Sequence, residues 1–231
     1  MSRSTGAWSL NGAYAFPIDS LSKVQLDADY FRLSHGSGVK GTNALSADLH
    51  YSYKMDDIPV GGFAGRYSNN GNATWGFGLE GSLPVGKWDW MPGGRSTWSD
   101  SSILNVQGFY ARTGGSRTNG WGSRFDLRSY PCDDFRVNAN FAFHHTSASY
   151  GGPLRYTDNM FIFGLGFAYL FDCGYSVYGD YDHTYFSRSG LNVDGFTLGV
   201  RYYFGRAPKI RDTEGPRYGN FGRLLGVSAK F

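Results

Sequence analysis

The feature that most constrains this chain is the alternation of apolar and polar residues in a series of short stretches. In the stretch 195–205, for example, Phe196, Leu198, Val200 and Tyr202 alternate with glycine, threonine and arginine. Successive side chains of a β-strand point to opposite faces, so a period of two gives each stretch one apolar and one polar face. Phe, Tyr, Trp and Leu dominate the apolar face, which is typical of a transmembrane β-barrel with lipid outside and a polar interior.

Composition agrees with membrane strands and argues against membrane helices. Aromatic residues make up 18% of the chain, and 34 of its 231 residues are glycine. The mean hydropathy is −0.38. The longest apolar run, 160–171, is shorter than the ~20 residues that a spanning helix needs. A barrel strand needs only about 9–11 residues, and its inward face can be polar.

The alternation predicts an all-β fold: a single antiparallel transmembrane β-barrel of about 12 strands (10–12), connected as an up-and-down meander. Bacterial single-chain barrels have even strand numbers. We expect the whole chain, 1–231, to form one barrel domain. The expected strands span 6–16, 23–33, 44–54, 59–67, 73–83, 102–112, 121–130, 134–145, 160–171, 174–186, 195–205 and 221–231.

Two kinds of connection are expected between these strands. Short turns rich in Asp, Gly and Pro are typical of tight hairpins, and longer, polar loops on the opposite rim are typical of outer-membrane barrels. The stretch 84–101 breaks this pattern, and its three tryptophans predict a position at a membrane interface. The expected short turns are 17–20, 55–58, 131–134 and 172–174, and the expected longer loops are 34–43, 68–73, 113–120, 146–159 and 187–194.

The sequence leaves two ways to close the barrel. The segment 206–220 is charged and linker-like, and 221–231 alternates again and ends on Phe231. In the first closure, 221–231 is the twelfth strand, which the terminal phenylalanine favours. In the second, the eleventh strand closes the barrel, an N-terminal strand is missing, and 206–231 is a tail.

Segments such as 196–205 (FTLGVRYYFG) and 169–175 (YLFDCGY), in which an aromatic-rich strand leads into a short turn, resemble small porin-like outer-membrane proteins of Gram-negative bacteria, in particular the alphaproteobacterial type. The resemblance implies a location in the outer membrane, with lipid and lipopolysaccharide around the barrel. Because residues 1–5 lead directly into a strand-like stretch, we expect that a signal peptide has been removed from this chain.

The alternation assigns a set of charged side chains to the polar inner face. One interpretation is a narrow, water-filled channel for passive diffusion of small polar solutes or ions. The alternative is a closed interior, crosslinked because buried charges must be paired, in a structural barrel that binds a partner through its loops. The expected lumen-lining residues are Asp27, Asp29, Asp48, His50, Glu80, Arg124, Asp126, Arg128, Arg136, Asp180, Asp182 and Arg201.

Few residues support the hypothesis that the chain is an enzyme. His145 and Ser147 are two positions apart and therefore share one strand face, a spacing that resembles the His-x-Ser pair of outer-membrane lipid A deacylases. Position 148, however, is alanine, where that family has asparagine. Asp180, Asp182 and His183, together with Asp27 and Asp29, resemble the Asp and His pairs of omptin-like proteases. We expect no catalytic residues, and the lipid A-modifying enzyme is a minor alternative.

Cys132 and Cys173 are the two cysteines, and both fall in expected short turns of consecutive hairpins. An oxidising periplasm would allow a disulfide between them, whereas two unpaired thiols remain the alternative because bridging requires close Cα atoms. No metal-ligand spacing or phosphate loop is present, so no metal and no cofactor are expected.

The net charge is only +3, and the basic residues are scattered, so nucleic acid is not an expected partner. A second copy of the chain or another outer-membrane protein is a candidate protein partner. A soluble β-sandwich is the remaining alternative for the fold, because its strands alternate as well.

Overall fold

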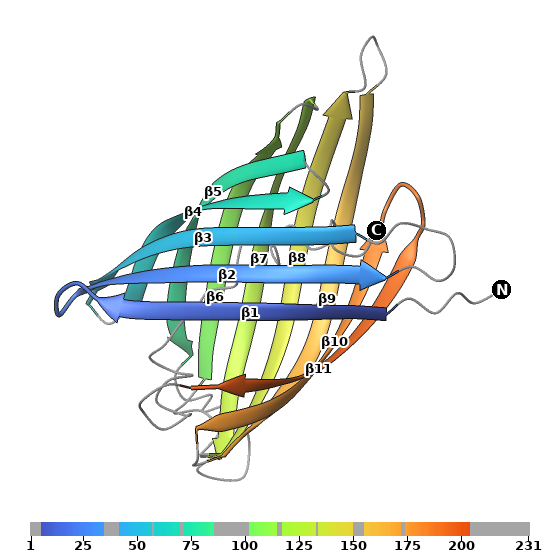
Figure 1. Ribbon diagram of the computed structural model, residues 1–231. Coiled ribbons are helices and arrows are strands. Elements are labelled where there is room, and N and C mark those ends of the chain that lie inside the picture. The colour runs from blue at the N-terminus through green and yellow to red at the C-terminus, as the bar shows by residue number, and fades with distance from the viewer. Residues whose placement is uncertain are drawn as a thin grey trace, which may run out of the picture.

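The chain forms one curled antiparallel sheet of eleven strands in a computed structural model (Figure 1). The structure describes residues 6–34, 42–56, 58–69, 72–85, 102–114, 117–132, 134–149, 155–171 and 174–203. The strands are β1 (Gly6–Pro17), β2 (Ser22–Ser34), β3 (Thr42–Met55), β4 (Ile58–Asn69), β5 (Asn72–Val85), β6 (Ser102–Thr113), β7 (Arg117–Cys132), β8 (Phe135–Ser149), β9 (Arg155–Leu170), β10 (Tyr175–Phe186) and β11 (Asn192–Tyr202).

The strands follow one another around the sheet in chain order, so the predicted up-and-down meander is confirmed. Each pairs antiparallel with its neighbours in sequence, and within the described residues β1 pairs with β2 alone and β11 with β10 alone. An odd number of antiparallel strands leaves β1 and β11 running in the same direction. The expected twelfth strand, 221–231, and the linker 206–220 lie outside the described residues.

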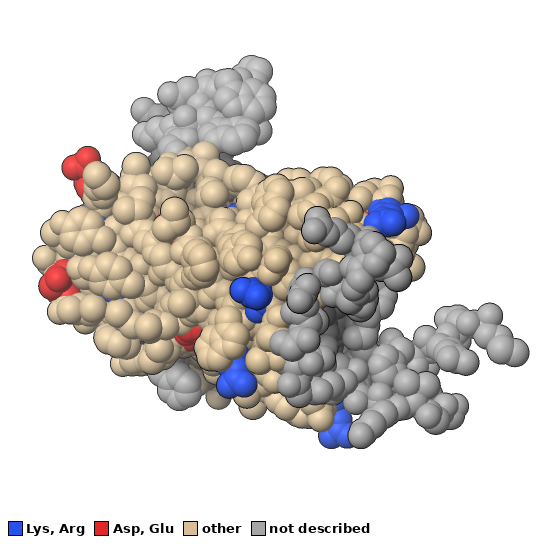
Figure 2. Space-filling model, turned by 90° about the horizontal axis from the view of Figure 1, so that it is seen from above, with Lys and Arg blue, Asp and Glu red and all other residues tan. Residues whose placement is uncertain are grey.

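Side-chain exposure divides the sheet into an apolar convex face and a more polar concave face. Large apolar side chains point outward, and Leu79 on β5 is 76% exposed. Charged and polar side chains such as His50 and Glu80 are buried on the other face. A soluble β-sandwich would bury its apolar face between two sheets, whereas this chain forms a single curled sheet with that face outside. Figure 2 shows one side of the molecule, on which charged atoms are few.

The connections differ from the expected asymmetry. We call the rim with the connections 18–21, 56–57, 86–101, 133–134 and 171–174 the turn rim, and the rim with 35–41, 70–71, 114–116, 150–154 and 187–191 the loop rim. Longer loops were expected at 68–73 and 113–120, but β4, β5, β6 and β7 continue into these segments. That expectation is wrong because Ser, Asn and Thr, which suggested loops, also occupy the ends of paired strands.

No helix in the described part of the chain is long and apolar enough to cross a membrane.

Candidate functional site

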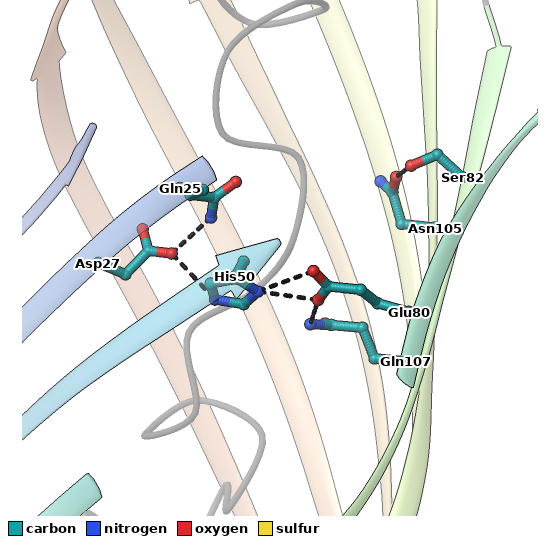
Figure 3. Close-up of polar contacts among 7 residues, drawn as sticks. All are labelled: Gln25, Asp27, His50, Glu80, Ser82, Asn105 and Gln107. Atoms are coloured by element: carbon teal, nitrogen blue, oxygen red, sulfur yellow. Dashed lines mark hydrogen bonds and ion pairs between the residues drawn. The ribbon is translucent and has the colours of Figure 1, made fainter. Parts of the chain in front are cut away.

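A network of buried polar side chains on the concave face joins residues of four strands, β2, β3, β5 and β6 (Figure 3). His50 Nδ1 on β3 lies 2.8 Å from Glu80 Oε2 on β5, and His50 Nε2 lies 3.2 Å from Asp27 Oδ2 on β2. Gln107 on β6 donates a hydrogen bond to Glu80 over 3.2 Å, and Gln25 donates one to Asp27. Both ring nitrogens of His50 are therefore directed at carboxylates, and each carboxylate also accepts from an amide.

The register of the sheet produces this network. Gln25 is the direct cross-strand partner of His50, and Asp27 is the partner of Asp48, so His50 and Asp27 are diagonal neighbours. Glu80 is likewise the direct partner of Gln107. Because strand residues two apart share a face, all five side chains point inward, as the alternation predicts for this part of the chain.

Basic side chains gather on the concave face of β7 and β8, away from the acidic network. Arg124, Asp126 and Arg128 follow at every second position of β7, and Arg128 Nε lies 2.9 Å from Asp126 Oδ2. Arg136 on β8 is buried as well. On β11, the guanidinium of Arg201 lies 5.3 Å from the ring centre of Tyr178. The expected lumen residues thus occupy concave positions, with acidic residues on β2, β3, β5, β7 and β10, histidine on β3, and arginines on β7, β8 and β11.

A glycine on β9 allows side chains of β8 and β10 to meet across that strand. Asn138 Nδ2 donates to Asp180 Oδ1 over 3.4 Å. A Cβ atom added at Gly166, which lies between these two residues, would be 2.0 Å from that same Asp180 oxygen, so the contact needs a glycine there. This dependence is a long-range property that periodicity alone could not show.

An aromatic row lies beside the network, toward the loop rim. Phe63 stacks on His50 with ring centres 5.3 Å apart, and Phe109 meets His144 edge-on at 5.0 Å. The Phe63 ring covers Gly78, where an added Cβ would be 2.6 Å from it. The concave face is therefore polar toward the turn rim and partly apolar toward the loop rim, a division that the sequence analysis missed.

His145 and Ser147 lie on the convex side of β8, as their alternation predicts. Their direct partners on β7 are Trp121 and Asn119, which are exposed. His145 Nδ1 is 2.7 Å from Asn159 Oδ1 on β9, so an amide, and not a carboxylate, orients the imidazole. The described hydrogen bond of His145 is to Asn159 and not to Ser147.

The Asp and His residues of the omptin-like hypothesis are separated by the sheet. Asp180 and Asp182 face the concave side, where Asp180 meets Asn138. His183 faces the convex side, and its Nδ1 lies 2.9 Å from Asp194 Oδ1. Among the described residues, no group of three or more His, Cys, Asp or Glu side chains is arranged to hold a metal ion.

The structure does not test whether Cys132 and Cys173 form a disulfide, because Cys173 lies outside the described residues. The β7–β8 and β9–β10 connections do share the turn rim, where Leu170 N donates to Asp134 O over 2.7 Å. A disulfide between Cys132 and Cys173 and two unpaired thiols both stay open.

Comparison with known proteins rests on structure. No protein-family model and no curated protein matches the sequence. The fold is similar to that of the KdgM porin in complex with disordered oligogalacturonate, with a TM-score of 0.54 and 11% identity over 88% of this chain and 97% of that one. It is also similar to the NanC porin, with a TM-score of 0.52 and 15% identity over 85% and 99% of the two chains.

A third similar structure is not described as a porin. The β domain of the Bordetella autotransporter BrkA matches with a TM-score of 0.52 and 15% identity, over 87% of this chain and 91% of that one. Identities this low show a shared fold alone, because one fold hosts several functions. The side chains of this chain must therefore decide what the sheet does.

Proposed function

We propose that this chain is an outer-membrane β-barrel of a Gram-negative bacterium that forms a narrow, porin-like channel for passive diffusion of small polar solutes or ions. The observation that carries the proposal is the distribution of side chains on a porin-like sheet. Apolar side chains cover the convex face, and buried polar and charged side chains lie on the concave face, mainly toward the turn rim. Lipid solvates the first kind of surface, and a water-filled lumen or internal pairing satisfies the second.

The charges on the concave face favour passage of small solutes over passage of an extended polyanion. Acidic side chains lie on β2, β3, β5, β7 and β10, and arginines lie on β7, β8 and β11, so a solute would meet charges of both signs. The KdgM porin was solved with an acidic oligosaccharide. An extended polyanion in this chain would meet Asp27 and Glu80 as well as the arginines, which favours small ions and short polar molecules.

The channel needs no covalent chemistry, and we propose that the chain is not an enzyme. His145 and Ser147 face outward, and Asn159 supplies no negative charge to stabilise an imidazolium, as the orienting carboxylate of a catalytic triad does. Surrounding lipid and lipopolysaccharide are the expected environment of these residues.

A closed barrel that binds a partner through its loops is the second candidate, and one observation favours it. His50, Ser82, Ser176 and Thr184 face inward, yet each has at most 1% of its surface exposed. Side chains that line an open lumen would touch water, whereas these four are covered by other atoms of the chain.

Solute flux into proteoliposomes distinguishes the two candidates, and adjacent residues on β11 supply a matched pair of variants. Thr197 is exposed on the concave face, opposite Asp180, and Leu198 is exposed on the convex face. An open channel predicts sugar and amino-acid entry that Thr197→Trp reduces and Leu198→Trp leaves unchanged. Absence of entry through folded, inserted protein would favour the closed barrel.

A further inference from the structure

The convex face carries few charges, and they are all of one sign over most of the sheet. Among the described side chains of β1 to β9, the charged residues at outward positions are Arg32, Arg66 and Arg112. Each lies within four residues of a strand end at the loop rim. No Asp or Glu occupies an outward position of these nine strands in the described part of the chain, so the sheet offers these arginines no carboxylate neighbour on this face.

Two of the arginines form a row with an exposed tryptophan. Arg66 on β4 is the direct cross-strand partner of Trp75 on β5, and Trp75 is the direct partner of Arg112 on β6. The guanidinium of Arg66 lies 5.1 Å from the centre of the Trp75 ring. Trp75 is 59% exposed, and both arginines are exposed.

The spacing of this row suits one small anion. Adjacent strands are about 4.8 Å apart, which puts the Cα atoms of Arg66 and Arg112 roughly 10 Å apart. Arginine side chains are long enough to converge across that distance. Stacking on Trp75 uses the face of the Arg66 guanidinium and leaves its N–H groups, which lie in the plane of the group, able to donate.

The surroundings of the row are those of a membrane interface. Tyr110, Trp121 and Phe77 face outward one step nearer the middle of the sheet, and Tyr110 and Trp121 are direct partners. Tyrosine and tryptophan prefer the headgroup level of a bilayer. An arginine at that level that lacks a protein carboxylate is favoured when an anionic headgroup lies beside it.

We propose that Arg66, Trp75 and Arg112 form a binding site for the phosphate of a membrane-lipid headgroup in the leaflet at the loop rim. The guanidinium forks match phosphate oxygens in a bidentate manner, and Trp75 packs against the apolar part of the same lipid. This inference rests on the proposed membrane location, but not on whether the lumen conducts.

The test is binding of diphosphoryl lipid A to the purified, folded protein in detergent micelles, measured by native mass spectrometry. One arginine near a charged membrane surface contributes about 1 kcal/mol, so Arg66→Gln or Arg112→Gln should weaken binding about fivefold and the double variant about thirtyfold. Arg66→Lys should retain part of the affinity, because lysine keeps the positive charge but cannot donate the paired hydrogen bonds of a guanidinium. Dephosphorylated lipid A should bind all variants equally, and inorganic phosphate should not compete at millimolar concentration.

Arg32→Gln is the matched control, since Arg32 is also outward, exposed and next to a tryptophan, Trp8, but has no second arginine across the strands. Its effect should be smaller than that of either single variant. If all three single variants weaken binding equally, the lipid is held by general electrostatic attraction and not at a specific site, which contradicts the proposal. An unchanged affinity of the double variant would also overturn it. A protein that inserts and conducts but shows no phosphate dependence refutes this site alone, whereas failure to insert refutes the proposed function as well.

Discussion

The imidazole of His50 and the carboxylate of Glu80 lie 2.8 Å apart, with side chains that are 1% and 0% exposed. The contact joins β3 to β5 and passes over β4, which separates them in the sheet. Backbone pairing already holds adjacent strands together. A side-chain link between strands that are not adjacent fixes, in addition, how sharply the sheet curls.

His50 should therefore be a stabilising residue of the concave face. Removing one partner of a buried ion pair leaves uncompensated charge and typically costs about 3–5 kcal/mol. His50→Ala leaves both Asp27 and Glu80 without the imidazole, so we expect its free energy of unfolding to fall by that order. Urea titration of the protein in lipid vesicles, followed by tryptophan fluorescence, measures the change.

The control for His50→Ala removes the two charges as well. The triple variant Asp27→Asn, His50→Ala, Glu80→Gln should be more stable than His50→Ala alone, because amides tolerate the loss of the imidazole better than buried carboxylates do. A triple variant less stable than the single one would show that the charges are not what His50 compensates.

Glycine at position 78 is predicted to be a packing requirement. A Cβ atom there would be 2.1 Å from the carbonyl oxygen of Gly108 and 2.6 Å from the Phe63 ring, whereas one at Gly12 meets nothing within 4 Å. Overpacking of this kind typically costs about 1–3 kcal/mol. Gly78→Ala should lower the unfolding free energy by that amount, and Gly12→Ala should leave it within about 0.5 kcal/mol. Equal effects at both positions would contradict this packing.

The depth of a residue in the membrane should set the cost of a charge on the convex face. Leu165 lies near the middle of β9 and is 66% exposed, whereas Asn119 is an exposed residue near the loop-rim end of β7. An arginine costs about 2–4 kcal/mol at the bilayer midplane and about 0–1 kcal/mol near the interfaces. Leu165→Arg should therefore destabilise the protein in vesicles far more than Asn119→Arg. The same small cost at both positions would indicate that this face meets water.

The turn between β1 and β2 should respond to acid through Asp19. Asp19 Oδ1 accepts hydrogen bonds from Leu21 N at 2.8 Å and from Ser22 N at 2.6 Å, and these bonds lower the pKa of its carboxyl. A lowered folded-state pKa stabilises the fold above the unfolded value of about 3.9, and that stabilisation is lost as the pH falls through the folded-state pKa. Asp19→Asn should flatten the dependence of stability on pH below about pH 4. An unchanged profile would exclude this carboxylate as its source.

How much the sequence could predict depends on how regular each strand is. The eleven strands from β1 to β11 were all predicted, because an apolar side chain at every second position of the convex face leaves a strong pattern. β7, β8 and β9 extend several residues further toward the loop rim than expected, over Thr118, Ser147 and Thr157 respectively. Polar residues on both faces have no alternation, so backbone pairing continues there without a signal in the sequence.

The sequence predicts which face of the sheet each site residue occupies, but not which of these residues contact one another. Alternation assigns His50 and Glu80 to the inner face, but only the register and the curl of the sheet bring residues 30 positions apart within 2.8 Å. The row of Arg66, Trp75 and Arg112 was missed for the same reason. In the sequence, each arginine is a single polar residue in the apolar face of its own strand, and only the register of β4, β5 and β6 places both beside Trp75.

Single-channel recording in a planar lipid bilayer tests the central claim most directly. We expect reproducible open steps from the folded protein, a smaller step for Thr197→Trp, and a shift of the reversal potential toward cation preference for Arg124→Gln. Folded, membrane-inserted protein that carries no current under any applied voltage would contradict the channel.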